Sequence, residues 1–411
     1  MVESNEFDAI VVGGGPGGSV ASAYMTKAGL KVLLLEKQKF PRDKTCGDAV
    51  SGKSMGILRE LGWDKDLEKV DHAKVFGVIF SSPNGKQVEI PFGKADNPSR
   101  SFGYVSRRNI ADNVWFQNAK KSVTKCIENF TVTDVLKEKD YVVGVKGKNA
   151  NNGKEEEYRA KIVIGADGAS SVIAKQLNVV DQDPDHWVVA LRAYYEGIEN
   201  LTQNIELHFF DSIIPGYFWI FPVENGQANV GIGILKSEVS KKGLNLKKLM
   251  LEAIEKEPII KERFKNAKLT SNIMGWNLPL GSNIWKNHGN GYMLIGDASS
   301  LIDPFSGEGQ GNAMLSAKIA ADYATRALKE ENFSKEFFAG YDKDLRKRIE
   351  PEIKTSHRLQ KIGRYKMLLN FIVGKAASSD EVAKVISSML SEEERKHQFF
   401  SPLFYLKLLF S

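Results

Sequence analysis

A glycine-rich segment near the N-terminus carries the first chemical signal in this chain of 411 residues. An apolar run at residues 9–12 ends in GGGPGG, and a run of small residues at 19–28 follows. Three glycines thus show the spacing G-x-G-x-x-G between a predicted strand and a predicted helix: Gly13, Gly15 and Gly18. The first permits a tight turn, the second lets the backbone approach a pyrophosphate, and the third lets helix and strand pack closely.

The predicted helix and the next strand complete a nucleotide-binding unit. A helix N-terminus presents free N–H groups and a partial positive charge, which favour a phosphate beside Pro16 and Gly17. A second apolar run at residues 32–35 ends in Glu36, 21 residues after Gly15. An acid at this place can accept a hydrogen bond from a ribose hydroxyl, and Lys37 lies beside it. The unit predicts an adenine dinucleotide and leaves NAD and FAD open.

Three later motifs decide between these two cofactors. They are GADG at residues 165–168, GDA at residues 296–298, and PFSGEGQG at residues 304–311, which opens a predicted helix. Together with the glycine turn, and in this order, they resemble the large flavoprotein group that includes the aromatic hydroxylases. The resemblance covers about the first 330 residues and implies FAD.

The resemblance also implies roles for single residues. Asp297 would bind a ribityl hydroxyl of FAD, although an ordinary helix cap is the alternative. The helix that opens at residues 307–309 would direct N–H groups to the pyrimidine edge of the flavin. Asp167 would lie near both cofactors, or would form a common Asp–Gly turn. The complete set assigned to FAD is Gly13, Gly15, Pro16, Gly17, Gly18, Glu36, Lys37, Cys46, Arg108, Asp167, Gly168, Gly296, Asp297, Pro304, Gly307, Gly309, Gln310 and Gly311.

Arg108 enters that set through the R-x-x-F-D pattern of the same flavoproteins. Here Ala111 replaces the aromatic residue of the pattern, and Asp112 follows Arg108 at the i, i+4 spacing of a helix. The alternative is a surface ion pair, which stabilises a helix by about 0.3–0.5 kcal/mol.

Two further stretches indicate the substrate. One is CGDAVS at residues 46–51, and the other is YFWIFP at residues 217–222, followed by NVGIG at residues 229–233. Both resemble the geranylgeranyl reductase family. On a strand, Tyr217, Trp219 and Phe221 share one face, so with Pro222 they could line an apolar tunnel for an isoprenoid chain, or simply pack in the core.

The first stretch supplies the catalytic candidates, which are Cys46, Gly47 and Asp48. A thiol beside the flavin could donate the proton that completes saturation of a double bond. At its ordinary pKa of about 8.5 the thiol would start protonated. The alternative is that Cys46 is a small apolar residue in a tight loop.

The resemblance implies an FAD-dependent oxidoreductase that saturates isolated C=C bonds of a long-chain isoprenoid or prenyl lipid by hydride transfer from reduced flavin. NAD(P)H or another reductant would be the electron donor. Two other classes stay open on the same scaffold: a flavin-dependent monooxygenase or halogenase, and a non-catalytic flavin-binding or electron-transfer protein.

The elements that must hold these residues predict an α/β fold. A discontinuous Rossmann-type FAD-binding domain takes residues 1–70, 100–180 and 276–330. An inserted antiparallel β-sheet, built from residues 71–99 and 181–275, forms the substrate domain, and residues 331–411 form a C-terminal helical region. Within the first domain we expect separate strands at residues 155–160 and 161–164.

Composition narrows the partners and the location. The net charge of +6 without a dense basic tract argues against nucleic acid, and two distant cysteines predict neither a metal site nor a disulfide. The acidic start does not resemble a signal peptide, and no apolar run reaches the ~18 residues of a membrane span. We expect a cytoplasmic protein, with peripheral contact to the inner membrane face left open. The apolar cluster at residues 399–410 would be an interfacial anchor or a docked helix.

Overall fold

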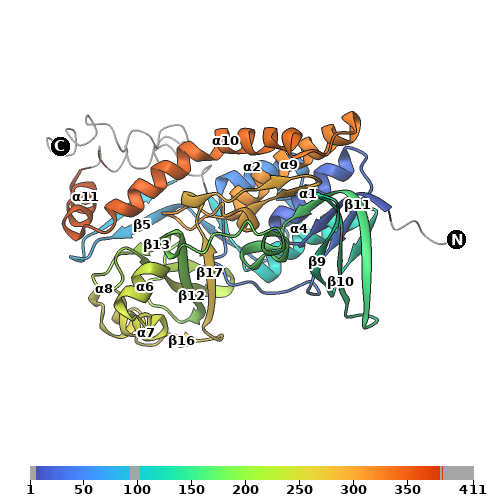
Figure 1. Ribbon diagram of the computed structural model, residues 1–411. Coiled ribbons are helices and arrows are strands. Elements are labelled where there is room, and N and C mark those ends of the chain that lie inside the picture. The colour runs from blue at the N-terminus through green and yellow to red at the C-terminus, as the bar shows by residue number, and fades with distance from the viewer. Residues whose placement is uncertain (1–5, 93–101, 380–381, 383–411) are drawn as a thin grey trace.

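A computed structural model describes residues 6–92, 102–379 and 382 of the chain. Figure 1 shows two large β-sheets, with α10 running along the top of the molecule and α11 at its left end. This arrangement confirms the predicted α/β fold with a second sheet and C-terminal helices. The apolar cluster at residues 399–410 lies outside the described residues.

The first sheet holds the glycine turn. Its central order is β18 (His288–Gly289), β19 (Tyr292–Leu294), β11 (Lys154–Gly165), β1 (Glu6–Val12), β2 (Val32–Leu35) and β8 (Lys125–Ile127). The pairs β1–β11, β1–β2, β11–β19 and β2–β8 are parallel. Strands of a parallel core are covered on both faces, which explains why β2 reads as an unbroken run of Val and Leu.

β11 is one strand of 12 residues where the sequence predicts two. Its first half pairs antiparallel with β10 (Tyr141–Asn149), which in turn pairs with β9 (Phe130–Glu138). Its second half pairs parallel with β1 and β19. The change from charged to apolar residues near residue 160 therefore marks entry into the core and not a break in the strand.

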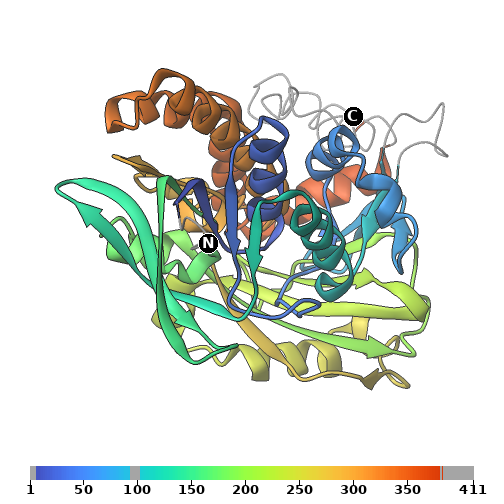
Figure 2. The same ribbon diagram turned by 90° about the vertical axis from the view of Figure 1, so that its right-hand side faces the viewer.

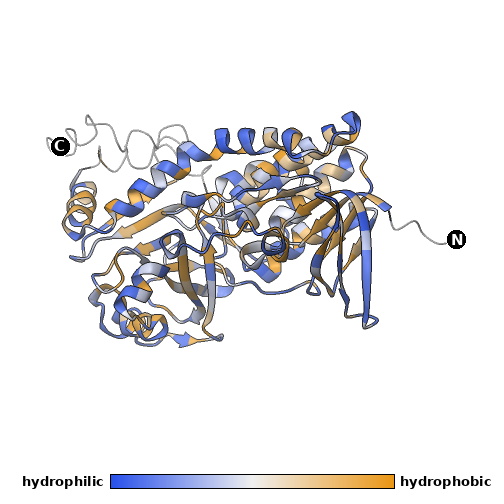
Figure 3. Ribbon diagram, in the orientation of Figure 1, coloured by the Kyte–Doolittle hydropathy of each residue, from blue (hydrophilic) through white to orange (hydrophobic). Residues whose placement is uncertain are grey.

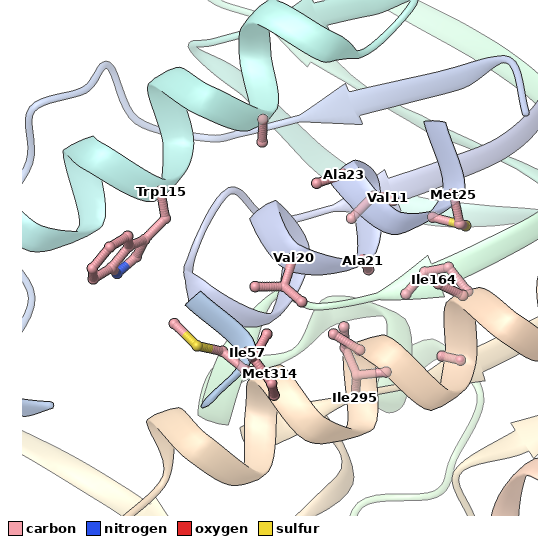
Figure 4. Close-up of a cluster of buried hydrophobic side chains, with 14 of the residues drawn as sticks. Val11, Val20, Ala21, Ala23, Met25, Ile57, Trp115, Ile164, Ile295 and Met314 are labelled. Carbon is pink, nitrogen blue, oxygen red and sulfur yellow. The ribbon is translucent and has the colours of Figure 1, made fainter. Parts of the chain in front are cut away.

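Helices α1 (Pro16–Lys27), α4 (Arg108–Ser122) and α9 (Gln310–Glu330) cover one face of this sheet. α1 is built from small residues, so α9 can approach it closely. Figure 4 shows Val20 of α1 and Met314 of α9 in one buried cluster with Val11 and Ile164 from the strands and Trp115 of α4. This packing fixes the start of α1, where the phosphate site is expected.

The second sheet has the order β16 (Lys268–Leu269), β12 (Trp187–Glu196), β15 (Gln227–Leu235), β14 (Tyr217–Pro222), β13 (Ile205–His208), β5 (Gly77–Ser81) and β6 (Gln87–Pro91). β17 (Met274–Pro279) also pairs with β12. The pairings are antiparallel except that β13 and β5 run parallel, because β5 arrives from a separate section of the chain. β5 and β6 thus join strands from residues 181–275 in one sheet.

Three helices cover the outer face of the second sheet. They are α6 (Lys236–Lys242), α7 (Leu246–Lys256) and α8 (Pro258–Lys261), which pack on β12 and β15 through a cluster that includes Met250 and Ile260. Figure 2 shows the sheet as a broad layer beneath the helices of the first domain. The other face of the sheet, with the alternate side chains of each strand, is turned toward the glycine turn.

Shorter elements connect the two sheets. α2 (Gly52–Leu61) and α3 (Asp64–Leu67) follow the loop after β2, and β3 (Ala49–Val50), β7 (Gly103–Val105) and β4 (Ala73–Val75) form a small third sheet. α10 (Lys335–Ile362) packs on α9 and is mainly hydrophilic along its length in Figure 3. α11 (Lys366–Ser378) then turns against β6.

Candidate functional site

A cavity of about 650 Å³ lies between the glycine turn and the inner face of the second sheet. Most of the predicted site residues line it: Gly15, Pro16, Gly17, Cys46, Gly47, Asp48, Arg108, Gly168, Tyr217, Trp219, Phe221, Gly296, Asp297, Pro304, Gly307, Gly309 and Gln310. The other predicted residues are not part of the cavity wall in the described part of the chain: Gly13, Gly18, Glu36, Lys37, Asp167, Pro222 and Gly311. The fold thus brings together the cofactor, catalytic and substrate candidates around one space.

The glycine turn leaves almost no room for side chains. Gly13 has a φ of +106°, and a Cβ added at Gly18 would lie 1.8 Å from the carbonyl oxygen of Gly13. At Gly15, by contrast, the nearest atom to an added Cβ is Nη2 of Arg42, at 3.7 Å. The backbone of Gly15 is therefore open toward the cavity, with a cation opposite. This arrangement fits a dinucleotide pyrophosphate.

Glu36 ends β2 with its carboxylate turned toward the glycine turn. The backbone N–H of Gly14 donates to Oε2 at 2.7 Å, and that of Gln38 donates to Oε1 at 2.9 Å. A carboxylate has about four acceptor positions, so Glu36 can still accept from a ribose hydroxyl. Lys37, the next residue, is exposed at the surface.

Arg108 belongs to a buried charge cluster, and not to a surface ion pair. Its Nε and Nη2 donate to the two carboxylate oxygens of Asp112 at 2.7 and 2.8 Å. Arg42 donates to the same carboxylate at 2.6 Å, and Arg108 also interacts with the thiol of Cys46. Burial alone would raise the pKa of Asp112, but the two guanidinium groups outweigh it and lower that pKa.

The cluster of Arg42, Arg108 and Asp112 has two cations for one carboxylate, so it favours an anion nearby. Arg42 was not predicted from the sequence as a site residue. Its position in the loop directly after the β2 acid, where the chain must pass the glycine turn, is the feature that could have indicated it.

Asp167 uses its carboxylate to bind the start of the next helix. Its carboxylate accepts from the Ser171 hydroxyl and from the backbone N–H of Val172 at 2.7 Å, so it stabilises the start of α5 (Val172–Gln176). Burial raises its pKa. Gly168, with a φ of +77°, is the member of this motif that reaches the cavity wall.

Asp297 lies in the cavity wall with Lys44 as its charged partner. Lys44 Nζ is 3.3 Å from Oδ2, and the Asp297 side chain is 12% exposed. A Cβ added at Gly309 would come within 3.4 Å of the same carboxylate, so the glycine keeps the space beside it free. A carboxylate here can accept from a hydroxyl of the cofactor.

The PFSGEGQG segment bends sharply before α9. Gly307 has a φ of +71°, and the helix begins at Gln310, after the expected residues 307–309. The carboxylate of Glu308 accepts the N–H of Gly311, and burial raises the pKa of Glu308. One N–H of the first turn is therefore capped by the chain itself, while Gly307 and Gly309 face the cavity.

Tyr217, Trp219 and Phe221, which we call the aromatic wall, extend from one face of β14 and line the cavity. The hydroxyl of Tyr217 donates to the carbonyl of Ser306 at 2.7 Å, which ties the wall to the PFSGEGQG segment. A Cβ at Gly231 of β15 would lie 2.2 Å from the Trp219 ring. The glycines of NVGIG thus make room for the indole.

Asn229 of β15 joins the aromatic wall to the segment at residues 46–51, which we call the cysteine loop. Its Nδ2 donates to the carbonyl of Cys46 and to Oδ2 of Asp48, both at 2.7 Å. Its Oδ1 accepts from Nε1 of Trp219 at 2.8 Å. Asn229 was not predicted from the sequence as a site residue, although a buried amide within the apolar part of β15 could have indicated it.

Asp48 is fully buried with a φ of +69°. The hydroxyl of Tyr194 donates to its Oδ2 at 2.6 Å, while Oδ1 has no hydrogen-bond partner within the described residues. Burial raises the pKa of Asp48 to about 6, against the opposing effects of Tyr194, Arg192 and Asn229. A carboxyl in this setting can gain or lose a proton near neutral pH.

A second polar chain on β5 and β13 resembles a hydrolase triad but has no access to the cavity. Ser81 Oγ lies 2.9 Å from Nδ1 of His208, and Nε2 of His208 lies 3.1 Å from Glu206. Arg263 donates to both oxygens of Glu206. All three members are 0–1% exposed, so the chain stabilises the sheet and offers no nucleophile to a substrate.

Two family profiles match the chain. The profile described as an FAD binding domain matches residues 6–194, and the profile described as a geranylgeranyl reductase catalytic domain matches residues 188–275. The second match contains most of β12 and all of β13 to β16, and the inner face of these strands carries the aromatic wall. FAD is therefore the cofactor that the chain binds.

Several relatives match over most of their length. The digeranylgeranylglycerophospholipid reductase of Methanosarcina acetivorans is 32% identical over 80% of this chain and 78% of its own. A second protein of that name from Methanococcoides burtonii is 32% identical over 86% of this chain and 83% of its own.

Solved structures agree on the fold. A geranylgeranyl bacteriochlorophyll reductase-like protein of Thermoplasma acidophilum superposes with a TM-score of 0.81 at 26% identity, over 96% of this chain and 98% of that one. A flavin-dependent brominase superposes with a TM-score of 0.77 at 22% identity, over 94% of both chains, and this likeness concerns the fold alone.

Proposed function

Because this chain belongs to the geranylgeranyl reductase family of FAD-dependent oxidoreductases, we propose that it saturates isolated C=C bonds in the isoprenoid chains of a prenyl glycerophospholipid. The observation that carries this proposal is the shared cavity. The glycines and acids expected at FAD, such as Gly15 and Asp297, line the same space as the apolar inner face of β12, β13 and β14.

The residues of the cavity fit the cofactor. Gly15 leaves space for a pyrophosphate, with Arg42 and Arg108 as cations, and Glu36 and Asp297 are carboxylates able to accept from sugar and ribityl hydroxyls. When bound, FAD supplies the electron pair and one hydrogen for the reduction. NAD(P)H, or another reductant of equal capacity, would restore the reduced cofactor.

The apolar part of the cavity suits an isoprenoid chain. Val188 and Ala190 of β12, Leu207 of β13 and Leu278 of β17 line it together with the aromatic wall. An isoprenoid offers few polar atoms, so its affinity must come from buried area at about 25 cal/mol per Å². An isolated double bond has no carbonyl to polarise, and the rate must therefore rest on close positioning in a dry site.

The cysteine loop would supply the second hydrogen as a proton. Cys46 lines the cavity beside Arg108, and Asn229 holds its carbonyl in place. Gly47 packs against Phe221, since a Cβ added there would lie 3.0 Å from the ring. Asp48 anchors the loop from behind through Tyr194 and Asn229. We assign proton delivery to the Cys46 thiol and positioning to Gly47 and Asp48.

A matched pair of variants tests the proposal. Val188 lines the cavity, whereas Val189 next to it in β12 is not part of its wall. The holoenzyme would be reduced with dithionite without oxygen and mixed with digeranylgeranylglycerophospholipid. We expect the lipid to accelerate reoxidation of the flavin and to gain two hydrogens per reduced bond by mass. Val188→Phe should slow reoxidation of the flavin by the lipid by about tenfold or more, because the ring takes up space in the cavity, while FAD stays bound. Val189→Phe should leave the reoxidation rate unchanged.

Two outcomes would contradict the proposal. Incorporation of oxygen or halide into a substrate under air, with no saturation without oxygen, would favour the monooxygenase or halogenase class. Reduction of bound FAD with no lipid able to reoxidise it would favour an electron-transfer protein.

A further inference from the structure

Large exposed apolar side chains concentrate at the start of α11. Within the described residues six large apolar residues are exposed, and three of them lie at residues 365–371: Tyr365 at 66%, Met367 at 86% and Phe371 at 36%. We call these three residues the α11 patch. Met367 and Phe371 are four residues apart on a helix, so they share one face.

The chain around the patch is strongly basic. Residues 358–378 contain five Lys and Arg residues and no Asp or Glu: Arg358, Lys361, Arg364, Lys366 and Lys375. Arg364 lies 3.6 Å from Glu238, and Lys366 pairs with Asp211. A short helix with exposed aromatic and Met side chains among cations has the composition of an interfacial helix.

The patch adjoins the cavity. Gln360 and Gly363, at the end of α10, line the cavity, and the patch begins two residues later. The ion pair of Lys366 with Asp211 ties α11 to the loop between β13 and β14, where Phe209 and Pro215 also line the cavity. In Figure 1, α11 forms the left end of the molecule.

We propose that the α11 patch docks this protein on the surface of an anionic phospholipid bilayer, with the cavity next to the bilayer. The inference rests on the proposed function, because a prenyl lipid resides in a membrane and has to reach the cavity from there. The described helices include none that is long and apolar enough to cross a bilayer, so contact through them would be peripheral. Apolar side chains would enter the acyl boundary while the cations meet lipid phosphates.

The charges favour a bilayer over a protein partner or a second copy. Arg364 and Lys366 are ion-paired within the chain, but the segment around the patch keeps a net positive charge. An isologous contact would bring this segment against its copy, and like charges repel. A bilayer with anionic headgroups instead complements them. The patch does not include residues 399–410, for which the sequence alone suggested either an anchor or a docked helix.

The test uses the full-length holoenzyme and vesicles of phosphatidylcholine, with or without phosphatidylglycerol, in a flotation assay without substrate. The variant carries Met367→Glu and Phe371→Glu. The matched control carries Leu269→Glu and Met274→Glu, which are 48% and 46% exposed on β16 and β17. We expect the wild type to bind the anionic vesicles, and this binding should weaken as salt is added. Vesicle binding should fall by about tenfold or more in the α11 variant and change by less than about twofold in the control.

Four results would decide against the proposal. They are equal flotation of the α11 variant and the wild type, equal binding to neutral and anionic vesicles, a loss of self-association in the α11 variant by sedimentation, and a complete loss of binding on deleting residues 383–411 alone. FAD content and melting temperature confirm that each variant is folded.

Turnover of lipid in detergent separates this inference from the proposed function. Normal turnover in detergent with lost turnover on vesicles is expected for the α11 variant. Vesicle binding by a protein that reduces no lipid would leave the docking surface intact and refute the proposed function.

Discussion

At the scale of single residues, Asn229 and Asp48 connect the proposed chemistry to the fold. Asn229 uses both ends of its amide, so the carbonyl of Cys46 and the ring of Trp219 are held by one side chain. The motif at residues 46–51 could be predicted from the sequence as part of the site. Its partners Asn229 and Tyr194 could not, because a hydrogen bond between residues about 150 to 180 positions apart depends on the whole fold.

Asp48→Asn tests whether the buried carboxyl titrates near pH 6. In the folded state the pKa of Asp48 is raised from 3.8 to about 6, so protonation is favoured by folding. The raised pKa of Asp48 adds to the free energy of unfolding, and this contribution is complete below pH 4. It is lost as the pH rises through 6, and for two pKa units it amounts to about 3 kcal/mol. The variant cannot ionise, so its stability relative to wild type should rise between pH 4 and pH 7. Urea denaturation at several pH values measures the difference in the free energy of unfolding between the variant and the wild type. If this difference does not change with pH, the pKa of Asp48 is not raised.

At the scale of elements, apolar runs and the glycine turn predicted β1, α1 and β2. β2 and the β5–β6 hairpin follow apolar runs and a Pro-Asn-Gly turn in the sequence. The continuity of β11 could not be predicted, because the strand changes partners midway and its burial changes with them. α9 begins at Gln310, next to the expected start near residue 309, and Glu308 caps one of the N–H groups that the motif suggested as free.

Two Gly→Ala substitutions test which helix glycines are required for close packing and which only lower helix stability. A Cβ at Gly18 would lie 1.8 Å from a backbone oxygen, so Gly18→Ala must move α1 away from β1. We expect destabilisation of about 1–3 kcal/mol or more and loss of bound FAD. At Gly56 in α2 an added Cβ meets nothing within 4 Å, so Gly56→Ala should stabilise by about 0.5–1 kcal/mol. Urea denaturation and the flavin absorbance of the purified proteins provide both readouts.

At the scale of the whole molecule, α10 connects the cofactor motifs to the end of the cavity. Lys53 of α2 donates to Asn312 of α9 and to Glu352 of α10 at 2.8 and 2.7 Å. Gln360 donates to the carbonyl of Pro304 at 2.7 Å. The sequence predicted that residues after 331 are helical, but amphipathic periodicity says nothing about which loop a helix covers. The cavity itself was predicted only as an apolar tunnel along one face of the strand at residues 217–222.

Gln360→Ala tests the tie between α10 and the PFSGEGQG segment. The substitution leaves the buried carbonyl of Pro304 without its donor, which costs about 1–3 kcal/mol. Lys343→Ala, at an exposed position of the same helix, should stay within about 0.5 kcal/mol of wild type. Denaturant unfolding of the two variants provides the comparison, and equal stability would show that α10 is held without this bond.

The order of strands in the first sheet has a consequence for how the protein is made. β1 leaves the ribosome first, but β11 must be synthesised before it can pair with β1, and β19, which completes the parallel core, comes about 280 residues after β1. At typical synthesis rates this interval is roughly 15 to 60 s. During that time the apolar β1 and β2 lack their neighbours, so nascent chains should depend on chaperones. Because the glycine turn, Asp297 and Gly307 meet only after β19 is in place, the cofactor should be acquired late in synthesis or after release.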